Sequence, residues 1–228
     1  MGTVFITGAN RGLGLEFVKE FTEKKYEVIA TCRDLKSSSD LSALAKSNLT
    51  IQLHQLDVSN TKNIQELANK LQDKPIDVLI NNAGIYRSGI FNSVNKDSWV
   101  ESFITNTIGP YEVIEHFLPN ILKGRERKVV SITSKMGSID DNTSGGSYIY
   151  RSSKTALNSM MRSLTHDLKS HNIATMTLHP GWVRTDMGGP GGWIDVKESV
   201  SGMIDQISNL SLQNTGQYID YAGKIIKW

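Results

Sequence analysis

Short runs of apolar residues alternate along the chain with longer segments in which apolar residues recur every three or four positions. The apolar runs fall at residues 4–6, 27–32, 76–80, 128–134 and 173–178. Uninterrupted runs of this length are typical of strands buried on both faces, as in parallel sheets. The segments between them have the spacing of amphipathic helices. This alternation predicts a doubly wound α/β fold, a mostly parallel sheet with right-handed crossovers and helices on both faces.

Two further stretches complete the predicted sheet. Residues 50–56 alternate between apolar and polar side chains, which predicts a strand near the sheet edge with one exposed face. Residues 216–220 and 224–226 predict a last strand region, so the sheet has about seven strands. No linker or repeat divides the chain, and we expect residues 1–228 to form a single domain.

A long helix is predicted over residues 97–123, and it contains the pair Gly109-Pro110. Because proline removes a backbone donor and clashes with the preceding turn, we expect a kink at this pair. Asn106 lies one turn before the kink. Its amide could hold a water molecule at the freed backbone groups, or it could satisfy a buried neighbour.

Composition excludes several classes of protein. The formal net charge of +2 is too small to indicate binding to nucleic acid or to a membrane surface. No apolar run approaches the roughly 18 residues that span a bilayer, and the N-terminus has no secretory signal pattern. Cys32 is the only cysteine, which fits a reducing compartment, so we expect a cytoplasmic protein. The five histidines lack metal-ligand spacing, so we expect no metal site.

A glycine-rich turn joins the first strand to the first helix. It reads Thr7-Gly8-Ala9-Asn10-Arg11-Gly12-Leu13-Gly14. Glycine lets the backbone approach a ligand closely, and the free N–H groups of a first helical turn attract phosphate. The spacing differs from the Gly-x-Gly-x-x-Gly dinucleotide fingerprint. We nevertheless expect a cofactor diphosphate here, contacted by Gly8, Asn10, Arg11, Gly12, Leu13 and Gly14.

The second strand ends in Arg33-Asp34, where such folds meet the adenosine ribose of a dinucleotide. An arginine at this place accommodates a 2′-phosphate, and Arg11 in the glycine turn could converge on the same group. This pattern favours NADP(H) over NAD(H). Asp34 opposes that interpretation, because its carboxylate could turn inward and bind the 2′-hydroxyl instead.

Polar residues also follow the third and fourth predicted strands. Asp57-Val58 ends one strand, and the aspartate could bind the adenine amino group or cap a turn. Asn82-Ala83-Gly84 follows the other strand. We expect the asparagine amides to bind backbone groups and so to position the cofactor.

The candidate chemistry lies in two later segments. Ser134 ends the fifth predicted strand, and its hydroxyl could bind a substrate carbonyl or serve a turn. Tyr150 and Lys154 lie four residues apart at the start of a predicted helix and therefore share one face. A nearby ammonium lowers the pKa of a phenol, which could then exchange a proton with an alcohol or alkoxide. Alternatively, Tyr150 and Lys154 are an ordinary pair on the surface of an amphipathic helix and have no catalytic role.

A glycine-rich segment follows the sixth predicted strand. It begins at His179-Pro180-Gly181, continues through Trp182 to Met187, and ends in Gly188-Gly189-Pro190-Gly191-Gly192-Trp193. Flexible glycines that carry tryptophan and methionine are typical of a movable lid over an apolar substrate.

Taken together, these motifs resemble the short-chain dehydrogenase/reductase family over nearly the whole chain. The matching residues are Thr7-Gly8-x3-Gly12-x-Gly14, Asp57, Asn81-Asn82-Ala83-Gly84, Asn106, Ser134, Tyr150-x3-Lys154 and Pro180-Gly181. Within the family, Ser134 to Ile139 and Tyr148 to Lys154 are similar to sniffer-type carbonyl reductases and to C-factor-like proteins. Ser134 and Tyr150 stand further apart than in many members, because the loop 140–147 is long.

The resemblance implies a Rossmann-type fold and a catalytic tetrad. Tyr150 would be the acid/base, Lys154 would lower its pKa and bind the nicotinamide ribose, and Ser134 would orient the carbonyl. Asn106 would anchor a water in a proton relay with Lys154. Further cofactor contacts would come from Pro180, Gly181, Val183 and Thr185, with Thr185 at the carboxamide. Relatives also imply a homodimer or homotetramer.

The resulting expectation is an NADPH-dependent reductase of small apolar ketones, aldehydes or quinones. One alternative is an NADP(H)-binding regulatory protein of C-factor type, in which turnover is incidental; an intact tetrad argues against it. Another is a nucleotide-sugar epimerase or dehydratase, but the short chain after Pro180 leaves little room for the extra substrate domain.

Overall fold

A computed structural model describes all residues from 1 to 228. Its centre is a seven-stranded sheet in the order β3-β2-β1-β4-β5-β6-β7, and every neighbouring pair is parallel. The strands are β1 (Thr3–Ile6), β2 (Glu27–Cys32), β3 (Ile51–Gln55), β4 (Val78–Asn81), β5 (Lys128–Ile132), β6 (Ala174–His179) and β7 (Gln217–Asp220). The predicted doubly wound fold with about seven strands is confirmed.

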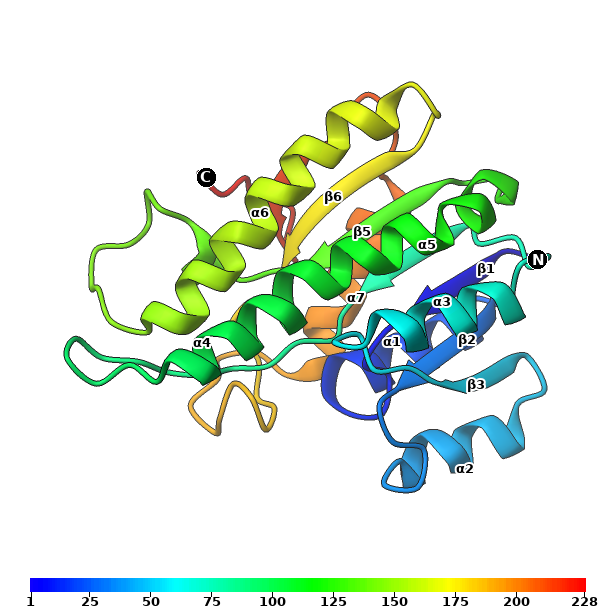
Figure 1. The fold of residues 1–228 in the computed structure, drawn as a ribbon. Helices are drawn as coiled ribbons and strands as arrows, with labels where there is room; N and C mark the ends of the chain where they lie inside the picture. Colours follow the sequence, from blue (N-terminus) through cyan, green and yellow to red (C-terminus); the bar gives the residue numbers. More distant parts are fainter.

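Helices cover both faces of the sheet (Figure 1). Their bounds are α1 (Gly12–Glu23), α2 (Ser39–Ser47), α3 (Thr61–Lys70), α4 (Lys96–Phe103), α5 (Gly109–Lys123), α6 (Tyr148–Lys169) and α7 (Val196–Ser208), with a π-helical turn η1 (Ile104–Ile108) and a 3₁₀ turn η2 (Lys135–Gly137). One apolar core packs α1, α2 and α7 on one face, and the other packs α3, α5 and α6 on the opposite face. No helix is long and apolar enough to cross a membrane.

The strand order reverses at β1, which pairs with β2 on one side and with β4 on the other. In open α/β sheets a ligand binds outside the carboxyl ends of the strands at such a reversal. The loops that precede α4 and α6 and the segment that precedes α7 all project from this end of the sheet (Figure 1). β3 is one of the two edge strands, as its alternating pattern predicted, and β7 is the other.

The helix predicted over residues 97–123 is divided into α4, η1 and α5. Gly109 and Pro110 begin α5, and the π-helical turn lies directly before them. Gly109 lies so close to Val58 that a side chain here would overlap the Val58 carbonyl oxygen. The expected kink is therefore a wider helical turn, and Asn106 lies fully buried inside it.

Candidate active site

The glycine turn has the shape of a phosphate cradle. Gly8 and Gly12 have left-handed φ angles of +66° and +52°, and a side chain at Gly14 would overlap the carbonyl oxygen of Gly8. Helix α1 begins at Gly12, and Arg11 at its N-cap makes no side-chain cap. The N–H groups of the first turn thus remain available to an anion.

Asn82 ties this turn to the end of β4. Its amide Nδ2 donates to the carbonyl oxygens of Thr7 and Gly8 at 2.9 and 3.0 Å. In return, Thr7 Oγ1 accepts from the backbone N–H groups of Asn82 and Ala83, both at 3.0 Å. The amide binds backbone groups, as the sequence predicted.

The sequence predicted that Arg11 and Arg33 could converge on the 2′-phosphate of a cofactor, and the structure gives these charged residues other surroundings. Arg11 Nη1 pairs with Asp186 Oδ2 at 2.8 Å, and both side chains are exposed. Arg33 is exposed directly after β2. Asp34 Oδ1 accepts from Lys36 N at 2.9 Å, and this bond, with one from the Ser37 hydroxyl, lowers the pKa of the Asp34 carboxyl. Asp34 therefore caps its own turn and does not point inward.

Asp57 also serves a turn. Its Oδ1 accepts from the N–H and the hydroxyl of Ser59 at 2.9 and 2.6 Å, while Asn63 Oδ1 accepts from Asp57 N at 2.7 Å. Asp57 thus caps a turn through one carboxylate oxygen, which is one of the two roles that the sequence predicted for it. Val58, the next residue, is buried against α5.

Both polar atoms of Asn106 bind protein groups. Oδ1 accepts from Ile85 N at 2.8 Å, and Nδ2 donates to Ile85 O at 2.9 Å and to Ser153 Oγ at 3.0 Å. This matches the alternative in which Asn106 satisfies a buried neighbour. A Cβ placed on Gly84 would lie 3.1 Å from Asn106 Oδ1 and 3.6 Å from Lys154 Nζ, so these three residues converge.

Tyr150 and Lys154 lie together in the first turns of α6 and are only 8% and 5% exposed. Lys154 Nζ lies 5.9 Å from the Tyr150 ring centroid and donates to Ile132 O at 2.9 Å. Burial raises the pKa of Tyr150 to about 12, although a hydrogen bond with the Ser134 hydroxyl lowers it. Burial also lowers the pKa of Lys154 to about 8.

These directions correct one expectation from the sequence. The pKa of Tyr150 is raised and not lowered, because loss of hydration outweighs the hydrogen bond with Ser134, while the amine of Lys154 donates to Ile132 O. The phenol holds its proton firmly at neutral pH, which suits a proton donor.

Ser134 lies where β5 gives way to η2. Its hydroxyl accepts from Met136 N at 3.2 Å, and its carbonyl accepts from the hydroxyl of Tyr218 at 2.6 Å. Tyr218 is buried in β7 and packs on Trp228, with ring centroids 5.3 Å apart. Sequence reasoning missed Tyr218, because its partner is 84 positions away and no motif marks it.

Tyr86 was also missed. Its ring packs on that of Tyr150 in an edge-to-face arrangement, with centroids 4.9 Å apart. It follows Asn82-Ala83-Gly84 by two residues, so its position beside that motif was the only available signal.

The segment after β6 lies over the glycine turn. A Cβ placed on Gly12 would lie 3.6 Å from the methyl carbon of Thr185, whose hydroxyl accepts from Gly188 N at 3.0 Å. Upstream, Pro180 O accepts from the Ser199 hydroxyl at 2.6 Å, Gly181 has a φ of +83°, and Val183 is buried. Thr185 thus lies beside the start of α1, whereas Pro180 is bound to α7.

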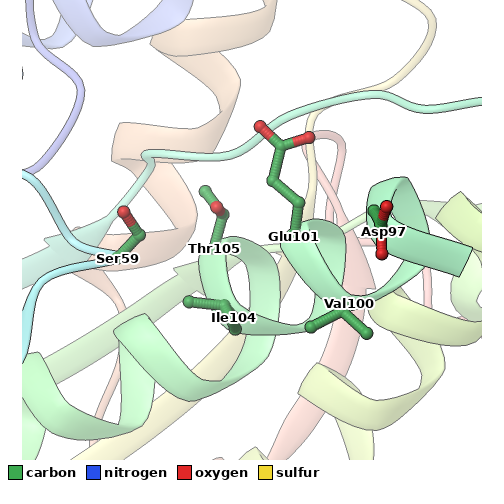
Figure 2. A pocket seen from close by; sticks show the side chains of 6 residues that line it. All are labelled: Ser59, Asp97, Val100, Glu101, Ile104 and Thr105. Atoms are coloured by element: carbon green, nitrogen blue, oxygen red, sulfur yellow. The ribbon is translucent and has the colours of Figure 1, made fainter.

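A separate hollow of about 360 Å³ lies between Ser59 and the α4–η1 helix (Figure 2). It is lined by Ser59, Asp97, Val100, Glu101, Ile104 and Thr105. None of the predicted tetrad residues lines it, and its two carboxylates would repel a phosphate. Its chemistry does not fit the cofactor diphosphate.

Known proteins share this fold and part of this sequence. C-signal of Myxococcus xanthus is 43% identical over 157 residues, which cover 68% of this chain and 93% of that protein. The structure of the carbonyl reductase Sniffer of D. melanogaster superposes with a TM-score of 0.95 at 34% identity, over 100% of both chains. An NADPH-bound carbonyl reductase from chicken fatty liver gives 0.94 at 35% identity, over 99% of this chain and 98% of that one. A family model described as short chain dehydrogenase matches residues 2–191, and the chain therefore belongs to the short-chain dehydrogenase family.

Proposed function

We propose that this protein is an NADPH-dependent oxidoreductase that reduces ketones, aldehydes or quinones to alcohols. The observation that carries the proposal is the meeting of a buried phenol, a buried amine and a strand-end hydroxyl, from Tyr150, Lys154 and Ser134. Two structural relatives described as carbonyl reductases support the substrate class.

The cofactor would lie across the carboxyl ends of the central strands. The turn from Gly8 to Gly14 would hold the diphosphate, because the missing side chains leave its backbone N–H groups open to an anion. Arg33, with Arg11 once it leaves Asp186, would bind the 2′-phosphate. Asp57 and Val58 would border the adenine, and residues 82–84, 180–185 and Lys154 the nicotinamide ribose and carboxamide.

When bound, the cofactor supplies the hydride. The residues of the chain supply orientation and a proton. The hydroxyl of Ser134 would donate to the substrate carbonyl oxygen, and the phenol of Tyr150 would protonate that oxygen as negative charge develops on it. A phenol whose pKa is raised to about 12 remains protonated at neutral pH and gives its proton only to the strongly basic alkoxide.

A panel of carbonyl compounds, incubated with NADPH and separately with NADH, tests the proposal. Loss of cofactor absorbance should depend on the carbonyl and should be faster with NADPH. A panel in which no ketone, aldehyde or quinone is reduced by either cofactor would overturn it.

C-signal similarity favours one second candidate, an NADP(H)-binding regulatory protein. In that case the protein would bind NADPH tightly and reduce no carbonyl, and the Tyr150→Phe variant would keep its biological effect.

We also propose a homodimer or homotetramer, because Val100, Ile108 and Tyr111 are exposed along α4, η1 and α5. Light scattering would measure the mass.

A further inference from the structure

The ring of Tyr86 forms part of the surface beside the candidate proton donor. It packs on Tyr150 with ring centroids 4.9 Å apart and an interplanar angle of 60°. Its hydroxyl lies 3.4 Å from Ser147 Oγ, one turn before Tyr150 at the start of α6. Tyr150 is 8% exposed, whereas Tyr86 is 39% exposed. The exposed part of the Tyr86 ring therefore lies directly beside the ring of the candidate proton donor.

The backbone around Tyr86 is held on both sides. Asn106 binds the N–H and the carbonyl of Ile85, the residue before it. On the other side, Arg87 pairs with Glu101 through two contacts of 3.1 and 3.2 Å, and Gly89 O accepts from Tyr148 N at 3.2 Å. Such a segment presents its side chain in one place before a ligand arrives, which lowers the entropic cost of binding.

The glycine-rich segment that follows β6 also carries aromatic side chains. Trp182 and Trp193 pack on each other there with centroids 5.3 Å apart, and both are largely exposed. Gly188, Gly189, Gly191 and Gly192 separate them along the chain. These two tryptophans do not contact Tyr150, whereas the ring of Tyr86 packs directly on it and can discriminate among substrates by shape.

We propose that Tyr86 is a specificity-determining residue that favours substrates whose carbonyl is attached directly to a flat ring. A flat ring lies against the Tyr86 ring over its whole area, whereas a saturated, puckered ring of the same carbon skeleton contacts it only at a few hydrogens. Aromatic pairs gain energy beyond the area that they bury. This gain corresponds to about a 2- to 12-fold preference for the flat substrate. The inference rests on the proposed reductase function and adds the residue that selects among its substrates.

The test compares kcat/KM for acetophenone and for cyclohexyl methyl ketone, with benzaldehyde and cyclohexanecarbaldehyde as a second matched pair. The two members of each pair have the same carbon skeleton and differ in the saturation of the ring, which makes one ring flat and the other puckered. The ratio of the two constants is measured for the wild-type protein and for Tyr86→Phe, Tyr86→Leu and Tyr148→Leu. Intrinsic differences in carbonyl reactivity cancel, because only the change of the ratio between proteins is used.

Tyr86→Phe keeps the ring and should keep the flat-to-puckered ratio. Tyr86→Leu keeps an apolar side chain without the flat face, and the ratio should fall about 2- to 12-fold. Tyr148→Leu is the control. Tyr148 lies at the start of α6 and is about as exposed as Tyr86, but its ring does not pack on Tyr150. Its replacement should therefore leave the flat-to-puckered ratio unchanged.

The test distinguishes failure of the proposed reductase function from failure of the specificity role of Tyr86. If the wild-type protein reduces neither pair nor any other carbonyl, the proposed function fails and this inference fails with it. If the protein reduces carbonyls but has no flat-ring preference, or if Tyr86→Leu slows both members of a pair equally, only the specificity role is overturned. A uniform loss would mean that Tyr86 merely supports Tyr150.

Discussion

Asn106 binds both backbone polar groups of Ile85 with a single side-chain amide, at 2.8 Å from Ile85 N and 2.9 Å from Ile85 O. The asparagine is fully buried in the π-helical turn η1, and Ile85 lies in the loop that leads from β4 to Tyr86. A third bond reaches Ser153 Oγ at 3.0 Å in α6, one residue before Lys154. One side chain thus joins the loop, the irregular helix and the candidate catalytic helix.

Asn106→Ala should lower the free energy of unfolding by about 2–3 kcal/mol, because it leaves the Ile85 backbone groups without partners. Urea denaturation at neutral pH measures this value. The control is Asn95→Ala, which removes an exposed cap of α4 and should cost about 1 kcal/mol. Equal losses in the two variants would contradict the role assigned to Asn106.

Tyr150→Phe should reduce kcat for carbonyl reduction at least about 100-fold, since the phenyl ring retains the packing but has no proton to donate. NADPH binding, followed by fluorescence titration, should change less than about threefold. Tyr148→Phe is the matched control and should keep its activity. Substantial turnover by Tyr150→Phe would remove the proton-donor role.

Arg33→Asp should weaken NADPH binding at least about tenfold and change NADH binding little, because only NADPH carries the 2′-phosphate. Fluorescence titrations with both cofactors measure the two dissociation constants. Lys169→Asp makes the same charge reversal at the C-terminal end of α6 and should affect neither. An unchanged NADPH/NADH ratio in Arg33→Asp would show that Arg33 is a solvated bystander.

His179 should make the protein sensitive to acid. Burial lowers the pKa of His179 to about 4, against an opposing influence of Asp220 and Asp141, and its Nδ1 is buried without a partner. A histidine in the unfolded chain has a pKa of about 6.5. Between these two values the unfolded state binds the proton and the folded state does not, so stability falls as the pH falls.

The loss from this one group amounts to about 3 kcal/mol between pH 7 and pH 4. Urea unfolding at several pH values should show a smaller loss for His179→Asn than for the wild-type protein. His171→Gln alters an exposed histidine and should follow the wild type. A His179→Asn variant with the wild-type acid dependence would rule out this explanation.

The pattern of the sequence alone determined the sheet and the local motifs. The short apolar runs are long enough only for strands, and amphipathic helical segments separate them, so the sequence predicted parallel β–α units. The alternation of apolar and polar residues in 50–56 placed β3 at an edge of the sheet. The pairing of Tyr150 with Lys154 followed from the 3.6-residue helical period. Each of these features depends on residues that are close in sequence.

Tertiary structure alone decided the electrostatics and the cross-chain contacts. The pKa of Tyr150 is raised, although its helical neighbour predicted the opposite, because burial depends on everything packed around the ring. The bond from Tyr218 to Ser134 and the pair Arg11–Asp186 join residues 84 and 175 positions apart. Local periodicity carries no information about such distant neighbours, because only the closed packing of the sheet and its helices brings them together.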